Sequence, residues 1–406
     1  MRVLYSFPHK LGASRICYTA WQQVNGLAAA GADVLVCPGV LQRPVPANVR
    51  VWPTLSRGRL RISYKVVGTM RALSWHDRIV ARRLERLKGK IDIVHAWPDA
   101  ALETLETAKR LGIATVLERP NAHTRYAYES VNAECRKLGI QLPPGHEYEF
   151  NLAKLRREEA EYAAADSLLC PSDFVVKTFL QEGFPADKLL RHQYGFDESI
   201  CCYEPHSSNS AGITMLFAGV CAVRKGLHFA LEAWLKSPAS RDGKFLIAGD
   251  FLPDYREMLA PMLAHPSVRV LGYRADIPDL MRQSDLFVLP SIEEGSALVT
   301  SEARGCGCVL LVSDATGAIC EHMKNALMHR VGDVEALTEH ITLLDRDRAL
   351  LEKLRANSLG GISELTWTAA GKRLLSAYET AVTRFANDGR GSFEATVSHA
   401  IAGAKG

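Results

Sequence analysis

The chain alternates short apolar runs with helix-like segments, and it does so in two separate series. The first series begins with "MRVLYSF" at residue 1, and the second begins with "ITMLFAG" at residue 213. Such alternation is typical of parallel sheets that are covered by helices on both faces. The polar, turn-rich stretch 201–212 separates the two series. The pattern therefore predicts an α/β protein with two doubly wound domains.

The chain has 406 residues, which is enough for two domains of ordinary size. We expect an N-terminal domain over residues 1–198 and a C-terminal domain over residues 199–370. A helix over residues 371–386 is expected to pack back on the N-terminal domain, and residues 387–406 are expected to form a flexible tail. Because open α/β sheets bind ligands at the carboxyl ends of their strands, the cleft between the two domains is the expected site.

Composition narrows the class of protein further. The hydrophobic content of 47% and the charged content of 23% are those of a soluble globular protein. No apolar run reaches the length of about 18 residues that a membrane-spanning helix needs, and the N-terminus resembles a first strand more than a secretory signal. The ten cysteines form no CxxC pair and have no histidines at metal-ligand spacing. We therefore expect buried free thiols and a cytoplasmic location.

The glycine pattern excludes the common nucleotide-cofactor motifs. A dinucleotide-binding domain has G-x-G-x-x-G after its first strand, but this chain has "PHKLGASR", with the single glycine Gly12. In the second series, Gly219 and Gly226 stand at the wrong spacing, and no Walker A sequence occurs. A hydride-transfer enzyme is therefore disfavoured.

The turn after the first strand of the second series carries two cations. Gly219 ends the strand, and Arg224 and Lys225 follow directly before Gly226 and an apolar helix. Glycine permits close approach of the backbone, arginine offers a bidentate fork, and lysine adds a compact charge. The turn suits a diphosphate, although a solvated turn with surface charges fits the sequence equally well.

The stretch "PSIEEGSALVTSEA", residues 290–303, places two carboxylates around the start of a helix. Glu294 lies on the expected loop, Ser296 is the expected N-cap, and Glu302 lies about 9 Å further along the helix. The free N–H groups of Ala297 and Leu298 would form an anion-binding helix end.

A nucleotide-diphosphate sugar has a matching layout. Its diphosphate could lie on the helix N-terminus, with one glutamate accepting hydrogen bonds from the transferred sugar and the other from the ribose. The alternative, that Glu302 occupies a solvent-exposed helix face, is disfavoured because its neighbours are apolar or small. Glu293 is expected to be only a neighbour of Glu294.

The longer stretch "PSIEEGSALVTSEARGCGCVLLVSDATG" resembles the E-x7-E signature of family 4 glycosyltransferases, which are retaining enzymes of the GT-B fold. The likeness extends over most of the chain, through "FAGVCAVRKGLHFALEAW", "FLIAGD", "VRVLGYRADIPDLMRQSDLFVLPS", "IDIVHAW", "LLCPSDFV", "QYGFD" and "LTWTAAGKRLLSAY". The resemblance implies two Rossmann-like domains facing a central cleft. The N-terminal domain would bind the acceptor, and the C-terminal domain would bind the nucleotide-sugar.

The resemblance also assigns roles to individual residues. Glu294, Arg224, Lys225 and His123 would be catalytic, with His123 facing the sugar and the acceptor. The residues implied for donor binding are Gly12, Gly219, Arg224, Lys225, Arg274, Glu294, Gly295, Ser296, Ala297, Leu298 and Glu302. Three positions depart from the family pattern: Gly12 stands alone in the first loop, Val220 replaces a common arginine, and Ser296-Ala297 replaces Phe-Gly. The donor preference of the family therefore does not transfer.

The expected function is that of a retaining hexosyltransferase in cell-surface polysaccharide or glycolipid biosynthesis. It would move a sugar from a nucleotide-diphosphate sugar to a hydroxyl of a glycan or lipid-linked glycan. No cofactor or metal is expected, because fixed cations and a helix N-terminus would stabilise the leaving diphosphate. Two alternatives remain open: a GT-B nucleotide-sugar 2-epimerase and a catalytically silent sugar-nucleotide-binding protein.

The segment 50–90 is strongly basic. It contains twelve lysines and arginines against Asp77 and Glu85, a net charge of +10, whereas the whole chain carries +4. Aromatic residues such as Trp52 and Trp75 lie among these cations. The segment fits peripheral contact with an anionic membrane on its cytoplasmic face. An anionic glycan acceptor and a solvated helix face fit equally well, and nucleic acid is not expected as a partner because no recognised binding module is present.

Overall fold

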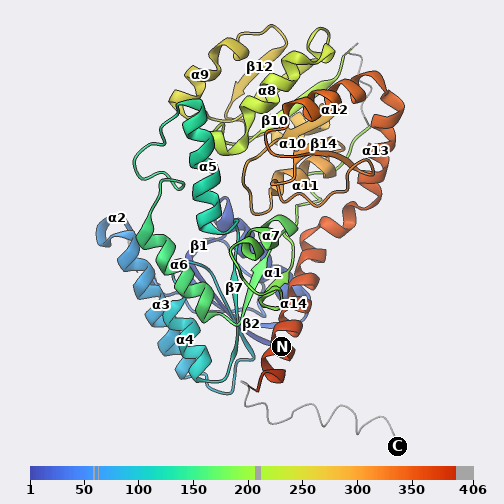
Figure 1. Ribbon diagram of the computed structural model, residues 1–406. Coiled ribbons are helices and arrows are strands. Elements are labelled where there is room, and N and C mark those ends of the chain that lie inside the picture. Colours follow the sequence, from blue (N-terminus) through green and yellow to red (C-terminus); the bar gives the residue numbers. More distant parts are fainter. Residues whose placement is uncertain (58–59, 63, 206–211, 390–406) are drawn as a thin grey trace, which may run out of the picture.

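The computed structural model describes residues 1–57, 60–62, 64–205 and 212–389, which form two lobes (Figure 1). The N-terminal lobe is built on a seven-stranded sheet of order β3-β2-β1-β6-β7-β8-β9, with every pairing parallel. Its strands are β1 (Arg2–Leu11), β2 (Asp33–Leu41), β3 (Arg50–Val51), β6 (Ile93–Ala96), β7 (Ala114–Glu118), β8 (Ser167–Cys170) and β9 (Leu189–Arg191). A small antiparallel pair, β4 (Ser56–Arg57) and β5 (Leu60–Arg61), stands apart.

The C-terminal lobe is built on a six-stranded parallel sheet of order β12-β11-β10-β13-β14-β15. Its strands are β10 (Thr214–Ala218), β11 (Lys244–Ala248), β12 (Val268–Gly272), β13 (Leu286–Leu289), β14 (Val309–Ser313) and β15 (Ala326–His329). Strands β13 and β14 are buried at every residue, as expected for apolar strands that are covered on both faces. The predicted pair of doubly wound α/β domains is confirmed.

Helices cover both sheets. Those in the N-terminal half are α1 (Ile16–Ala29), α2 (Tyr64–Val67), α3 (Thr69–Glu85), α4 (Leu102–Arg110), α5 (Thr124–Leu138), α6 (Leu152–Ala164), α7 (Asp173–Gln181) and the 3-10 turn η1 (Ala186–Lys188). Those in the C-terminal half are η2 (Val223–Lys225), α8 (Leu227–Lys236), η3 (Pro238–Ser240), α9 (Pro253–Leu263), α10 (Ile277–Arg282), α11 (Leu298–Gly305), α12 (Val334–Arg346), α13 (Arg348–Gly360), η4 (Ile362–Leu365) and α14 (Trp367–Asn387).

The last helix, α14, returns to the N-terminal lobe. It begins at Trp367, four residues before the predicted start, because Thr366 caps it by accepting a hydrogen bond from the Ala369 amide. Gly26 of α1 faces Gly371 of α14 so closely that a Cβ on either glycine would collide with the other backbone. Leu374 and Tyr378 then join the core under the N-terminal sheet.

The two chain segments that connect the lobes are bonded to each other. The amide of Phe196, which follows β9, donates to Leu365 O at 3.0 Å, and Phe196 forms a parallel β-bridge with Thr366. The predicted boundary at residues 198 and 199 therefore falls directly after this crossing. Part of the seam, residues 206–211, and most of the predicted tail, residues 390–406, lie outside the described residues.

Helix α5 also crosses between the lobes (Figure 1). It belongs to the N-terminal half in sequence, yet Ala127, Val131 and Cys135 are part of the hydrophobic core of the C-terminal lobe. Ile140 and Tyr148, which follow the helix, belong to the same core. Residues 124–148 therefore pack one domain on the other, which the simple division at residue 198 did not anticipate.

The structure also bears on membrane-spanning helices and on the cysteines. Among the described residues, none of the helices combines the length and the apolar character that crossing a membrane requires. The ten cysteines are free thiols, as expected, but burial is not uniform: seven are buried, Cys17 and Cys320 are half-buried, and Cys202 is exposed.

Candidate functional site

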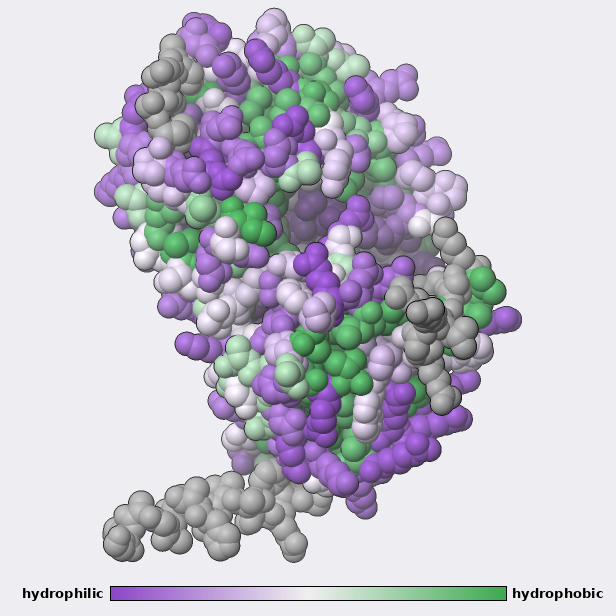
Figure 2. Space-filling model, turned by 180° about the vertical axis from the view of Figure 1, so that it is seen from behind, coloured by the Kyte–Doolittle hydropathy of each residue, from purple (hydrophilic) through white to green (hydrophobic). Residues whose placement is uncertain are grey.

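The strand ends of the C-terminal sheet meet the N-terminal lobe at a loop that contains Glu293, Glu294 and Gly295. This loop follows β13 and leads into α11. Figure 2 shows a hollow between the two lobes whose visible surface is largely hydrophilic. The candidate site is built around this loop, from residues of both domains.

Glu294 forms a buried cluster with the two cations of η2. Its Oε1 lies 2.8 Å from Arg224 Nη1, pairs with Lys225 Nζ and accepts a longer hydrogen bond from Ser291 Oγ. Burial alone would raise the pKa of Glu294, but the charges of Arg224 and Lys225 outweigh burial and hold this pKa below its usual range. The carboxylate is therefore ionised at neutral pH, and its Oε2 makes no hydrogen bond within the described part of the chain.

The cations are positioned by a single 3-10 turn that ends at Gly226. This glycine has φ +67°, and a Cβ there would collide with Pro290 O, so the turn lies tightly against the loop after β13. The Ile292 amide donates to Arg224 O at 2.8 Å and joins the two segments. Burial lowers the pKa of Lys225, and Glu294 opposes this effect. The structure thus joins Arg224 and Lys225, which the sequence assigned to a diphosphate, directly to Glu294, which it assigned to the transferred sugar.

Glu293 also takes part in the site, contrary to the expectation that it is only a neighbour. Its carboxylate is fully buried, and it accepts hydrogen bonds from the Ala122 amide at 3.0 Å and from the Tyr148 hydroxyl at 2.6 Å. Arg224 donates to Glu293 O at 3.0 Å, and its guanidinium lies 5.2 Å from the centre of the Tyr148 ring. Since Ala122 and Tyr148 belong to the N-terminal half of the chain, Glu293 connects the loop after β13 to the other domain.

The loop after β13 lies so close to the N-terminal lobe that only glycine fits at position 295. A Cβ at this position would collide with Pro120 O, and Ser172, at the start of α7, donates a hydrogen bond to Gly295 O. The loop is therefore held against two segments of the N-terminal lobe.

The start of α11 differs from the expectation. The helix begins at Leu298 with Ala297 as its N-cap, and no side chain caps it, so Ser296 is not the N-cap. The Ala297 amide donates to Thr316 O at 3.3 Å and is not free for an anion. The physical reason is that the contacts of Gly295 and Ala297 hold the chain extended, so that the helix starts two residues after Ser296. The amides of Leu298 and Val299 belong to the first turn, which an α-helix cannot satisfy internally.

Glu302 lies in the second turn of α11 and is half-buried. Burial raises the pKa of its carboxyl group. Within the described part of the chain its side chain has no hydrogen bond or ion pair, whereas Glu293 and Glu294 are both paired. A carboxylate in such a position is suited to accept hydrogen bonds from a bound ligand.

His123 lies at the start of α5, in the N-terminal half of the chain. Its ring is 2% exposed, accepts a hydrogen bond from the Arg125 amide as the N-cap of α5, and packs against Tyr162 and Phe179. Burial lowers the pKa of His123 to about 4, so the ring is neutral at pH 7. No hydrogen bond or ion pair joins His123 to the Glu294 cluster within the described residues, and its expected place facing the sugar and the acceptor stays a prediction.

The remaining predicted donor residues lie on neighbouring loops. Gly12 follows β1 with φ +86°, and a Cβ there would collide with the Arg43 side chain. Gly219 ends β10. Arg274, after β12, forms an exposed ion pair with Asp276 and makes no contact with the Glu294 cluster within the described residues. In the same part of the chain, no group of three or more histidine, cysteine or acidic side chains could hold a metal ion.

Comparison with known proteins identifies the fold. Residues 212–347 match the family model described as "Glycosyl transferases group 1". The structure superposes on Anabaena Alr3699/HepE, solved in complex with UDP and glucose, with a TM-score of 0.61 at 18% sequence identity, over 94% of this chain and 100% of that one. The fold is therefore GT-B, as the sequence predicted, and the C-terminal domain carries the glycosyl transferases group 1 match.

Two curated relatives match shorter parts of the chain. The Campylobacter jejuni N,N'-diacetylbacillosaminyl-diphospho-undecaprenol alpha-1,3-N-acetylgalactosaminyltransferase is 33% identical over 119 residues, which are 29% of this chain and 31% of the relative. The Escherichia coli UDP-Gal:alpha-D-GlcNAc-diphosphoundecaprenol alpha-1,3-galactosyltransferase is 29% identical over 114 residues, which are 27% of this chain and 30% of the relative. The chain thus spans about a third of the length of these relatives.

The contact between Tyr148 and Glu293 yields a prediction. Tyr148→Phe keeps the ring beside Arg224 but removes the hydrogen bond to a buried carboxylate, which costs about 1–3 kcal/mol. We expect the midpoint of thermal unfolding to fall by roughly 2–6 °C. Tyr126→Phe is the matched control, because the Tyr126 hydroxyl makes no hydrogen bond within the described residues. Equal midpoints for the two variants would contradict the proposed tie between the domains.

Proposed function

We propose that this protein is a retaining glycosyltransferase that moves a sugar from a nucleotide-diphosphate sugar to a hydroxyl of a glycan or lipid-linked glycan, in the biosynthesis of a cell-surface polysaccharide or glycolipid. The observation that carries this proposal is the buried cluster of Arg224, Lys225 and Glu294, with the unpaired carboxylate of Glu302 on the adjoining helix. The lipid-linked acceptors in the names of the two curated relatives support the acceptor class.

The electrostatics of the cluster favour a diphosphate. Arg224 and Lys225 bring two positive charges, and the ionised Glu294 neutralises one of them. Glu293 Oε2 lies 3.8 Å from Arg224 Nη1, but burial raises the pKa of Glu293 and so favours its neutral form. Burial weakens solvent screening, so the remaining charge acts strongly on an anion that enters the cleft. The two cations are also held by the Ile292 and Pro290 contacts described above, which means that little reorganisation is needed when charge develops on the leaving group.

The glutamates would bind the two hydroxyl-bearing parts of the donor. Because the contacts of Glu294 use Oε1, its Oε2 can accept hydrogen bonds from hydroxyls of the transferred sugar. Glu302 would accept hydrogen bonds from the ribose. The diphosphate would then lie between them, near the first-turn amides of α11.

In the proposed reaction, the bond between the anomeric carbon and the diphosphate oxygen breaks, and the bonding electrons stay on the leaving diphosphate. The acceptor hydroxyl forms the new bond on the same face, and its proton passes to an oxygen of the leaving phosphate. Arg224 and Lys225 stabilise the developing charge, so the proposed mechanism requires no metal. We assign no proton transfer to His123, whose Nδ1 accepts a hydrogen bond from the Arg125 amide as the cap of α5.

A donor screen tests the function. Purified protein is incubated with UDP-, GDP- and ADP-sugars without an acceptor, and release of nucleoside diphosphate is measured. We expect slow hydrolysis of one donor class. An epimerised sugar nucleotide with no released diphosphate would contradict the proposal, and so would the absence of both turnover and binding.

Two variants then test the assigned roles. Glu302→Gln should weaken donor binding by about tenfold, because it replaces charge-assisted hydrogen bonds to the ribose with neutral ones. Glu294→Gln should lower turnover by on the order of a hundredfold. Glu339→Gln, an exposed glutamate on α12, is the control for loss of one negative charge. Wild-type kinetics in both site variants would contradict the assignment.

We further propose that the protein contacts the cytoplasmic face of an anionic membrane through the basic segment 50–90. One exposed face of α3 carries Arg71, Trp75, Arg78 and Arg82. Arg71 and Arg82 have no ion-pair partner among the described residues, whereas Arg78 pairs with Glu103. Exposed Met70 and Val66 extend this face with apolar side chains. Cations beside exposed apolar groups suit the headgroup region of an anionic bilayer.

Flotation with liposomes tests the membrane contact. We expect the protein to float with vesicles that contain an anionic lipid, and to lose this association at high salt because the charges are screened. Arg71→Gln with Arg82→Gln should weaken flotation, while Arg269→Gln, an exposed change on β12 of the other domain, should not. Equal flotation with neutral vesicles would contradict the proposal.

A further inference from the structure

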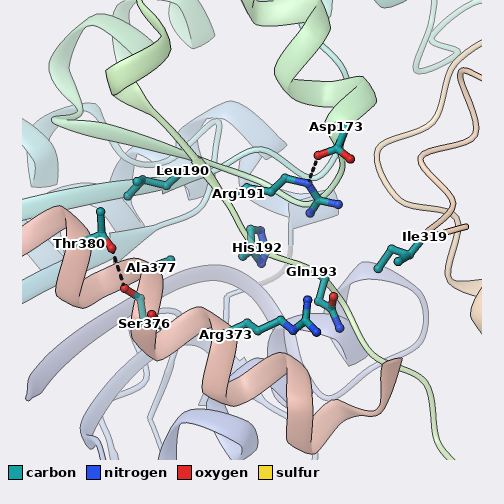
Figure 3. A pocket seen from close by; sticks show the side chains of 10 residues that line it. All are labelled: Asp173, Leu190, Arg191, His192, Gln193, Ile319, Arg373, Ser376, Ala377 and Thr380. Carbon is teal, nitrogen blue, oxygen red and sulfur yellow. Dashed lines mark hydrogen bonds and ion pairs between the residues drawn. The ribbon is translucent and has the colours of Figure 1, made fainter. Parts of the chain in front are cut away.

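A pocket of about 400 Å³ lies beside α14, and it shares no residue with the cluster of Arg224, Lys225 and Glu294 (Figure 3). Its walls come from the edge strand β9, from the start of α7 and from α14, and Ile319 of the C-terminal lobe closes one side. Its charged and ionisable lining residues are Asp173, Arg191, His192 and Arg373. The volume lies within the range of about 300–1,000 Å³ that is usual for small-molecule sites.

Two guanidinium groups face the pocket from different elements. Figure 3 shows Arg191 and Arg373 on opposite sides of His192. Arg191 binds Asp173 through Nε at 2.7 Å, and Arg373 binds Glu364 through one terminal nitrogen at 2.7 Å. Both carboxylates are largely exposed, so solvent weakens these pairs. The other N–H donors of both arginines have no partner within the described residues.

His192 supplies a second, independent sign of a ligand. Its ring is 2% exposed and lines the pocket, and Nε2 is hydrogen-bonded to the buried Glu118 at 2.9 Å. The other ring nitrogen, Nδ1, is buried and has no hydrogen-bond partner among the described residues. Because Nε2–H donates to the Glu118 carboxylate, Nδ1 of the neutral ring can only accept a hydrogen bond. A hydroxyl group of a bound molecule would supply the missing donor and remove the cost of the unpaired atom.

We propose that this pocket binds a small phosphate monoester, at a site separate from the donor site. Two arginine forks match the tetrahedral oxygens of a phosphate better than point charges would. The pocket has no phenyl, indole or phenol ring in its wall on which a nucleobase could stack, and its apolar residues are Leu190, Ile319 and Ala377. A phosphorylated sugar or similar small metabolite therefore fits better than a nucleotide. The inference does not depend on the proposed transferase activity.

Thermal unfolding with glucose 1-phosphate and inorganic phosphate tests the site, with sodium chloride at equal ionic strength as the reference. Binding to the folded state raises the unfolding midpoint in a saturable manner. The donor site could also bind phosphate, so the variants must separate the two. Arg191→Gln and Arg373→Gln each remove one fork of the pocket, whereas Lys225→Met weakens the donor site. Arg384→Gln is the matched control on α14, because Arg384 donates to Asp187 O outside the pocket.

We expect both phosphate ligands to raise the unfolding midpoint saturably in wild type, in Lys225→Met and in Arg384→Gln. In Arg191→Gln and Arg373→Gln the apparent affinity for these ligands should fall at least tenfold. Both pocket arginines are partly exposed, so their substitution leaves the fold intact, which the midpoints without phosphate verify. No saturable rise in wild type overturns the proposal. A rise that Lys225→Met abolishes, or that both pocket variants keep at wild-type affinity, overturns it as well.

Discussion

Two adjacent carboxylates, those of Glu293 and Glu294, are buried where the domains meet, and a buried carboxylate must be paired. Glu294 finds its partners in its own domain, in Arg224 and Lys225. Glu293 accepts hydrogen bonds from Ala122 and Tyr148 of the N-terminal half, and its Oε2 also lies 3.8 Å from Arg224 Nη1. The loop that carries both glutamates therefore needs hydrogen-bond and ion-pair partners from both domains. The turn with Arg224 and Lys225 therefore contacts a loop that residues of the N-terminal half also hold.

The way in which the chain crosses between the lobes fits this requirement. Phe196 and Leu365 bond the two connecting segments together, and residues 124–148 place apolar side chains in the core of the C-terminal lobe. Arg224 contacts these same segments. Its guanidinium lies beside the Tyr148 ring and donates to Glu293 O and to the Glu294 carboxylate. Loss of the contacts made by residues 124–148 is expected to disturb Arg224 as well as the domain interface, because Tyr148 belongs to the C-terminal core and also lies beside Arg224.

The sequence predicted the fold because its signals are local. Strands such as β13 and β14 are apolar runs between turn residues, and the turn with Arg224 and Lys225 lies within a few residues of the strand that positions it. It did not predict the partners of Glu293, which lie 145 and 171 positions away in segments without a distinctive pattern. The misplaced N-cap at Ser296 has a similar cause, since tertiary contacts of Gly295 and Ala297 decide where α11 begins. Strand β15, only four residues long, was not predicted either.

The central claim is that the donor diphosphate binds at Arg224 and Lys225. Isothermal titration calorimetry of matched nucleoside diphosphates and monophosphates tests it most directly, because the two ligands differ by one phosphate. Wild-type protein should bind the diphosphate at least about tenfold more tightly, a difference of about 1.4 kcal/mol, and Lys225→Met should abolish that advantage. An advantage that persists unchanged in Lys225→Met and in Arg224→Gln would contradict the account.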